Sequence, residues 1–306
     1  MSDLILHHYP MSPFSEKIRL MLGYSRMSWQ SVLTREMPPR PLVARLAGGY
    51  RKIPVAQIGA DIFCDSRTIA REIAILANQP ALALENCSPE VQAYVGDVDT
   101  KIFFACVFAG GSSKLSQKAR QSMSLFDLAR FIWDRVNMGR KATVAITSFR
   151  EAKPLVLQHL AAVEDLLTQD FMFGTQPNHA DFSTYHSLWF IRDLGESPMI
   201  NAFPRTIAWM DRMKAFGEGA RNEISGEQAL DIARDSVPRH IAAEHRVDPA
   251  IGKSVQIAPA DYAQTPTAGI LVGVTPSQWI LARQESGLGT LHVHFPQQGF
   301  SLMRAD

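Results

Sequence analysis

The order of strand and helix patterns near the start of this chain constrains its fold more than any other feature of the sequence. Short apolar or β-branched runs alternate there with segments whose apolar residues recur at helical spacing. The patterns predict, in order, a strand at residues 3–8, a helix at 13–22, strands at 29–33, 53–58 and 62–64, and a helix at 65–77. A βαβ unit followed by a ββα unit predicts an α/β domain over residues 1–78.

The spacing of apolar residues divides the rest of the chain into two further parts. Beyond a linker that contains Pro80 and Pro89, nearly every apolar pattern is helical as far as about residue 220. After Asp248, short alternating runs with glycine, proline and β-branched residues occur at 254–257, 269–273, 279–283 and 291–295. We therefore expect an all-helical domain at 88–224 and a small antiparallel β module of unknown role at 248–306.

The overall composition argues against several classes of function. The 31 basic and 30 acidic residues leave a net charge of +1, so no long-range field gathers nucleic acid or an anionic membrane. No run reaches the roughly 18 apolar residues of a membrane span, and the first residues show no targeting pattern. Three cysteines without a paired spacing favour a reducing compartment. We expect a cytoplasmic protein with neither a nucleic-acid nor a membrane partner.

Two serines stand where the first predicted helix begins. Ser12 precedes Pro13, which suits an N-cap followed by the first helical position. Ser12 and Ser15 also have an SxxS spacing at the place where a thioredoxin-like redox protein carries CxxC. A helix N-terminus offers unpaired amides and a partial positive charge, both of which stabilise a thiolate. A hydroxyl at this position can add a hydrogen bond to such a thiolate; alternatively, Ser12 only caps the helix.

Two further short motifs are suited to a peptide-like ligand. Ile53 and Pro54 open a predicted strand, and a cis bond between them would turn the Ile53 backbone outward to pair with a ligand in β fashion. Asp65 and Ser66 begin the next predicted helix, where amides, a hydroxyl and a carboxylate can hold an α-amino acid end. The plainer alternatives are a trans proline at a sheet edge and simple helix capping.

Taken together, these motifs resemble the glutathione transferase family over residues 1 to about 220. The stretch Ser12-Pro13-Phe14 with Lys17 and Arg19 is similar to the S-P-F-x-x-[KR]-[VI]-R stretch of serine-type, tau-like members, and to the C-P-F of omega and related classes with serine replacing cysteine. The other matches are Lys52-Ile53-Pro54-Val55 to K-[VI]-P-V, Asp65-Ser66 to [ED]-S, and Asn178-His179-Ala180-Asp181-Phe182 to [ST]-x-A-D-[FY]. The resemblance implies a thioredoxin-like domain followed by the family's helical domain.

The resemblance also implies an activity. Ser12 would donate its hydroxyl to the glutathione thiolate, with Tyr9 and Ser15 as rival donors. We therefore expect a homodimeric transferase of the detoxification type, with glutathione as co-substrate and a small apolar electrophile. A glutathione-binding or apolar-ligand-binding protein without turnover, and a glutathione-dependent isomerase or dehalogenase, are the alternatives. Serine at position 12 argues against disulfide exchange, because a hydroxyl forms no mixed disulfide.

The glutathione-binding residues carried over from the family are five. The backbone of Ile53, before a cis Pro54, would pair with the cysteinyl unit of glutathione. Asp65 and Ser66 would hold the γ-glutamyl end, although Asp65 is one methylene shorter than the commoner glutamate. Lys52 would meet the glycyl carboxylate.

The end of the chain goes beyond the usual length of the family. Residues 225–306 could cover the active-site cleft, replace a dimer contact or recruit another protein. His292 and His294 would share one face of a strand, as two metal ligands can. No third ligand stands at a supporting spacing, so we expect no metal.

Overall fold

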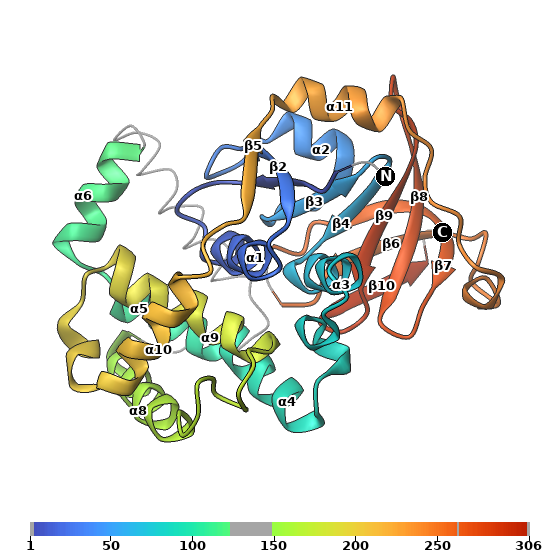
Figure 1. The fold of residues 1–306 in the computed structure, drawn as a ribbon. Coiled ribbons are helices and arrows are strands. Elements are labelled where there is room, and N and C mark those ends of the chain that lie inside the picture. Colours follow the sequence, from blue (N-terminus) through green and yellow to red (C-terminus); the bar gives the residue numbers. More distant parts are fainter. Residues whose placement is uncertain (1–2, 123–148, 262, 305–306) are drawn as a thin grey trace. The chain divides into compact units, whose positions relative to one another are not determined.

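The computed structural model describes residues 3–122, 149–261 and 263–304 (Figure 1). The chain divides into two compact units. The first unit comprises residues 1–18, 26–72 and 219–306, and the second comprises residues 19–25 and 73–218. The first unit is therefore assembled from segments that lie far apart in the sequence.

One mixed sheet forms the centre of the first unit. Within the described residues its ten strands run in the order β10-β6-β7-β8-β9-β4-β3-β1-β2-β5. Their bounds are β1 Ile5–His8, β2 Ser28–Leu33, β3 Val55–Ile58, β4 Asp61–Cys64, β5 Ala220–Glu223, β6 Ser254–Pro259, β7 Thr267–Val274, β8 Gln278–Glu285, β9 Gly289–Pro296 and β10 Phe300–Arg304. β1 is parallel to β2, and β3 is antiparallel to both β1 and β4. The block β2-β1-β3-β4 is the expected thioredoxin-like part.

Capping and terminating residues in the sequence mark the ends of several helices that pack around this sheet. These helices are α1 Pro13–Tyr24, α2 Pro41–Ala47, α3 Ser66–Leu76 and α11 Gly226–Arg234. α2 starts at a proline and stops at Gly48, whose φ of 66° lies in the left-handed region that glycine adopts readily. α11 opens with a capping box in which Ser225 and Gln228 satisfy each other's backbone amides.

The C-terminal strands continue the N-terminal sheet. β9 pairs in parallel with β4, with Asp61 opposite His292 and Phe63 opposite His294. The other pairs of the module, β10 with β6 and then β6 through β9 in sequence, are antiparallel as expected. The predicted limits of 1–78, 88–224 and 248–306 stay predictions, and residues 220–223 form β5 beside β2.

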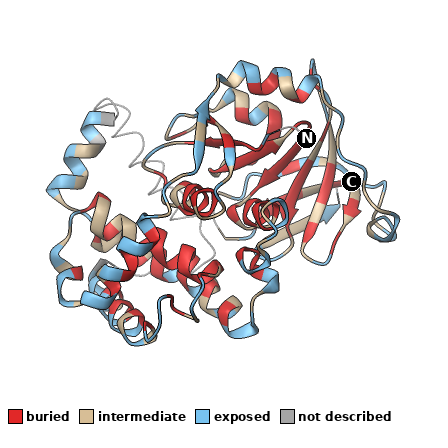
Figure 2. Ribbon diagram, viewed as in Figure 1, coloured by how far each residue is buried: buried red, intermediate tan, exposed pale blue. Residues whose placement is uncertain are grey.

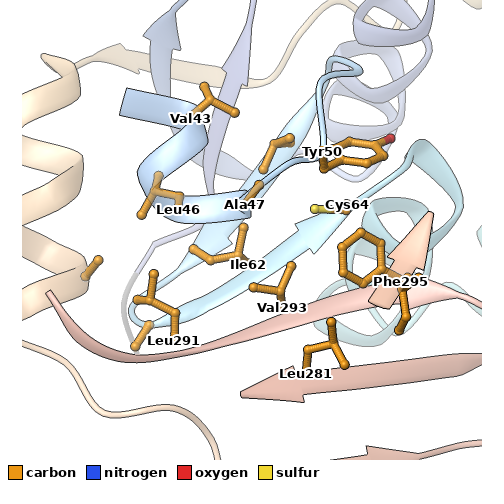
Figure 3. Packing of buried hydrophobic residues seen from close by; sticks show 14 of the residues in the cluster. Val43, Leu46, Ala47, Tyr50, Ile62, Cys64, Leu281, Leu291, Val293 and Phe295 are labelled. Atoms are coloured by element: carbon orange, nitrogen blue, oxygen red, sulfur yellow. The ribbon is translucent and has the colours of Figure 1, made fainter. Parts of the chain in front are cut away.

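The apolar core crosses the junction between β4 and β9. Side chains from α2, from β4 and from the module's strands are buried against one another (Figure 3). Among them are Val43, Leu46, Ala47, Tyr50, Ile62, Cys64, Leu281, Leu291, Val293 and Phe295. Burial of a side chain such as Leu or Phe contributes about 1.5–3 kcal/mol, so this shared core holds the module to the N-terminal block.

The module also satisfies the C-terminal end of α2. The guanidinium of Arg283, on β8, donates to the carbonyl oxygens of Arg45 at 3.0 Å and Leu46 at 3.2 Å. The hydroxyl of Thr267, at the start of β7, donates to the carbonyl of Ala47 at 2.9 Å. These carbonyls have no partner inside the helix, and a cation is favoured at this end of the helix dipole.

The second unit is helical. Its described helices include α4 Pro89–Asp97, α5 Phe103–Ala109, α6 Ser113–Ser122, α8 Phe149–Leu166, α9 His179–Trp189 and α10 Pro204–Lys214. The expected helical pattern also covers 123–148, which lie outside the described residues. Among the helices that are described, none combines the length and the apolar character needed to cross a bilayer.

α9 is the central helix of this unit. Its residues from His179 to Leu188 are buried (Figure 2). Its predicted capping box is present, because the Asn178 side chain accepts from the start of the helix and Asp181 reaches back to the Asn178 amide. The Asp181 carboxylate also accepts from Met172 N at 3.1 Å and from Trp209 Nε1 at 3.0 Å. Burial raises the pKa of Asp181 to about 6 against the effect of these hydrogen bonds.

Replacing Gly49 by alanine should destabilise the protein. A Cβ at Gly49 would collide with the carbonyl oxygen of Pro266, just before β7, and backbone on both sides must then move. We expect Gly49→Ala to lower the free energy of unfolding by about 1–3 kcal/mol in urea titrations. Gly96→Ala is the control: a Cβ at Gly96 has no atom within 4 Å, so equal losses from the two variants would contradict the close approach.

The buried His159 should make stability depend on pH. Burial lowers its pKa to about 4 from 6.5, so the folded state binds this proton less readily than the unfolded state. The difference in pKa contributes up to about 3 kcal/mol to the free energy of unfolding. This contribution is complete above pH 6.5 and is lost as the pH falls toward 4.

The test is the difference in free energy of unfolding between the wild type and His159→Phe at several pH values. We expect the wild type to lose stability relative to this variant as the pH falls from 7 to 4. Exposed His240, replaced in the same way, is the control. A difference that stays constant with pH would show that His159 is not kept neutral by burial.

Candidate functional site

The residues singled out in the sequence follow or precede three strands at one end of the sheet (Figure 1). His7 of β1 pairs with Val55 of β3, which in turn pairs with Cys64 of β4. Because β3 is antiparallel to both neighbours, the residues after β1, before β3 and after β4 lie at the same end. These residues are Tyr9, Ser12, Ser15, Lys52, Ile53, Pro54, Asp65 and Ser66.

Ser12 is the N-cap of α1. Its hydroxyl oxygen accepts from Ser15 N at 3.2 Å, and its carbonyl accepts from Glu16 N at 2.9 Å. A serine hydroxyl that accepts one hydrogen bond can still donate its own proton. Helix capping and donation to a thiolate are therefore compatible roles for the buried Ser12.

The two rival hydroxyls lie in different surroundings. Ser15 is fully buried, and its hydroxyl has no hydrogen-bond partner among the described residues. Tyr9 is half-buried, and the guanidinium of Arg40 lies 5.9 Å from the centre of its ring. Only Ser12 of the three sits at the capping position, where the helix amides and dipole act most directly.

Arg40 organises the backbone before β3. Its guanidinium donates to the carbonyls of Arg35 at 2.7 Å, Glu36 at 2.6 Å and Arg51 at 2.8 Å. The Ile53–Pro54 peptide bond that follows is cis, as the sequence resemblance implied. Arg40 was missed from the sequence, where it lies in a proline-rich stretch and belongs to no motif.

Asp65 connects β4 to α3 in an unusual backbone conformation. Its φ is 80°, and a carboxylate oxygen accepts from Arg67 N at 3.0 Å. Ser66 is buried at the first position of α3, and the hydroxyl of Thr68 donates to Cys64 O at 2.7 Å. Strained residues of this kind cost about 1–3 kcal/mol and cluster at ligand sites. Asp65 therefore caps the helix, and Asp65 and Ser66 both stand at the edge of the candidate site.

Lys52 already has a carboxylate partner. Its ammonium donates to both carboxylate oxygens of Asp261, at 2.7 and 2.9 Å. The Lys52 side chain is 13% exposed and that of Asp261 is 25% exposed, so the pair is largely shielded. Asp261 was missed from the sequence, because it is 209 positions away, in the connection from β6 to β7, and belongs to no motif.

His292 and His294 belong to an ion-pair network around Asp61. His294 Nε2 lies 2.8 Å from Asp61 Oδ1, and His292 Nδ1 lies 4.0 Å from the same atom. The other oxygen of Asp61 accepts from Arg239 N at 2.8 Å, and Arg239 also pairs with Glu72 at 3.0 Å.

Of the two histidines, His294 is hydrogen-bonded within this network, whereas His292 Nδ1 is buried without a hydrogen-bond partner among the described residues. Burial acts to raise the pKa of Asp61, but the hydrogen bond and charge of His294, together with Arg239, outweigh it and lower that pKa. In the part of the chain that the structure describes, no group of three or more His, Cys, Asp or Glu side chains could hold a metal ion. The network joins β4, β9 and α3.

Comparison with known protein families gives two matches. Residues 6–81 match the family described as "Glutathione S-transferase, N-terminal domain". Residues 134–215 match the family described as "Glutathione S-transferase, C-terminal domain". The first match contains the strand ends described above.

Individual relatives are consistent with these matches. A solved structure of a GST-like protein from Pseudomonas syringae is 31% identical, with a TM-score of 0.76 over 99% of this chain and 100% of that chain. That coverage includes the C-terminal strands. FtsZ-localized protein A from Caulobacter vibrioides is 24% identical over 215 residues, which are 69% of this chain and 86% of that protein. A solved structure of FzlA from C. crescentus is 22% identical, with a TM-score of 0.46 over 79% and 97% of the two chains.

Proposed function

Because this chain belongs to the glutathione S-transferase family, we propose that it binds glutathione at the shared end of β1, β3 and β4 and activates its thiol. The thiolate attacks an electrophilic carbon of a small apolar compound. A carbon–sulfur bond forms while the carbon loses its leaving group, and the thiol proton goes to solvent. The observation that carries this proposal is the position of the Ser12 hydroxyl at the N-terminus of α1.

Three effects act on a thiol placed next to Ser12. The first-turn amides of α1 and the helix dipole favour a negative charge, and the hydroxyl donates a hydrogen bond to it. A free thiol has a pKa near 8.5 and is mostly protonated at neutral pH. A decrease of about two units would make the thiolate the main form at neutral pH, and the thiolate is the nucleophile.

The other residues orient the peptide. The backbone of Ile53 pairs with the cysteinyl unit, as an added strand does, while Asp65 and Ser66 hold the ammonium and carboxylate of the γ-glutamyl unit. The buried Ser66 hydroxyl and the amides at the start of α3 suit the carboxylate. From the family membership we further propose a serine-type transferase that is homodimeric and cytoplasmic and acts in detoxification.

A second candidate is a binding protein without turnover. FtsZ-localized protein A bears a name that refers to FtsZ and not to a reaction, and it covers 69% of this chain. The same fold would then hold glutathione, an apolar ligand or a protein without catalysing transfer. A glutathione-dependent isomerase or dehalogenase would use the same thiolate with a different outcome.

Calorimetric titration with reduced glutathione separates these candidates. We expect saturable binding together with the ultraviolet absorbance of a bound thiolate at pH 7. Binding without thiolate absorbance would favour the binding protein. Absence of binding at millimolar glutathione would contradict the whole proposal.

Ser12→Ala should lower the transferase rate at pH 7 by about 10- to 100-fold, because the thiolate loses one donor. The rate should recover partly at high pH, where the thiol ionises without help. Loss of the N-cap should also lower the free energy of unfolding by about 1 kcal/mol.

Ser88→Ala is the matched control for this substitution. Ser88 is the N-cap of α4, where its hydroxyl accepts from Val91 N at 3.3 Å. This variant should lose similar stability and keep its activity. A larger loss of rate in Ser15→Ala or Tyr9→Phe than in Ser12→Ala would transfer the hydroxyl role to that residue.

A further inference from the structure

The connection between β6 and β7 reaches the segment that precedes β3. Asp261 lies in this connection, and both of its carboxylate oxygens accept hydrogen bonds from the Lys52 ammonium. Lys52 comes directly before Ile53, whose backbone the proposed function assigns to the cysteinyl unit of glutathione. The module thus places an acidic side chain one residue from the proposed peptide-binding backbone.

Hydrogen bonds anchor the connection between β6 and β7 on both sides of Asp261. Before it, Ala260 N donates to Gly299 O at 2.9 Å. After it, the Thr267 hydroxyl accepts from Tyr50 N at 3.1 Å and donates to Ala47 O at 2.9 Å. The connection that carries Asp261 is therefore anchored one residue before it and again at the first residue of β7.

Glutathione would bring a second carboxylate to the same place. The glycyl unit follows the cysteinyl unit, and one residue of extended peptide spans about 3.3 Å. If this peptide pairs with Ile53 in antiparallel fashion, its C-terminal end lies beside the residue before Ile53, which is Lys52. There its carboxylate would have to share one partly buried ammonium with Asp261, and two like charges at a shielded site repel each other.

We propose that Asp261 is a specificity-determining residue of the thiol site, because it occupies the place on Lys52 that the glycyl carboxylate of glutathione would take. This inference rests on the proposed function. The wild-type site then prefers γ-glutamylcysteinyl thiols whose end next to Lys52 carries no negative charge. Glutathione itself binds only when it displaces Asp261.

The test compares two ligands that differ in this one charge. Reduced glutathione and its glycyl monoethyl ester are titrated into the full-length wild type and into Asp261→Asn. We expect the wild type to bind the ester more tightly than glutathione. Asp261→Asn should gain about tenfold in affinity for glutathione, the size of one hydrogen bond to a charged group, and should bind the ester as before.

Two controls separate this effect from a general change in charge. Asp231→Asn removes an exposed carboxylate of α11, whose pair with Arg234 spans 2.7 Å, and should change neither affinity. Lys52→Gln leaves the Asp261 carboxylate without its cation, so this variant should widen the difference between the acid and the ester. In addition, Lys52 should react faster with an amine-acetylating reagent in Asp261→Asn than in the wild type, as measured by peptide mass spectrometry.

The outcomes distinguish the inference from the proposed function. If both ligands bind and Asp261→Asn changes neither affinity, or changes both equally, the role of Asp261 is wrong and the function stands. If neither ligand binds in any variant, the function and the inference are both overturned. Equal acetylation of Lys52 in the wild type and in Asp261→Asn would show that the ion pair does not hold in solution and would also overturn the inference.

Discussion

The parallel pairing of β9 with β4 is the interaction on which the first unit depends. Without it, β4 would be an edge strand with a row of unpaired amides and carbonyls, which proteins normally cover or shorten. With it, β4 is an interior strand, and the core around Ile62 and Val293 is continuous across the junction. The Asp61 network adds a charged contact at the same place, where removal of one buried partner would leave the others unsatisfied.

The candidate site follows from the direction of one strand. β3 is antiparallel to both of its neighbours in the N-terminal block, so two strand ends and one strand beginning meet at one end of the sheet. The N-terminus of α1 and the N-terminus of α3 both emerge there. Two sets of helix amides at the same end of the sheet suit a small anionic ligand. The strand order and directions of the sheet, together with the helix N-termini beside it, therefore determine where the site lies.

Much of this could be predicted from local sequence, and the rest could not because it is set by distant contacts. The N-cap at Ser12 and the box at Asn178 involve neighbours three residues apart, and both are present. β6 to β9 were visible as alternating runs. β5 was not, because its residues are polar and largely exposed and form a strand through pairing with β2. Three features leave no pattern in the sequence: the pairing of β9 with β4, the carbonyl contacts of Arg40 and the ion pair of Lys52. Each joins residues that belong to no recognisable motif.

The position of β9 in the chain has a consequence for synthesis on the ribosome. Residues 289–296 leave the ribosome roughly 10–45 s after residue 64 at the usual rates of translation. During that interval the nascent chain carries β4 without β9, and the apolar residues of α2 lack the module strands that cover them. Both segments of the helical unit, residues 19–25 and 73–218, have left the ribosome before β9, whereas the sheet is completed late. A nascent chain of this protein is therefore most exposed to misassociation at β4, the strand that lies deep in the finished sheet.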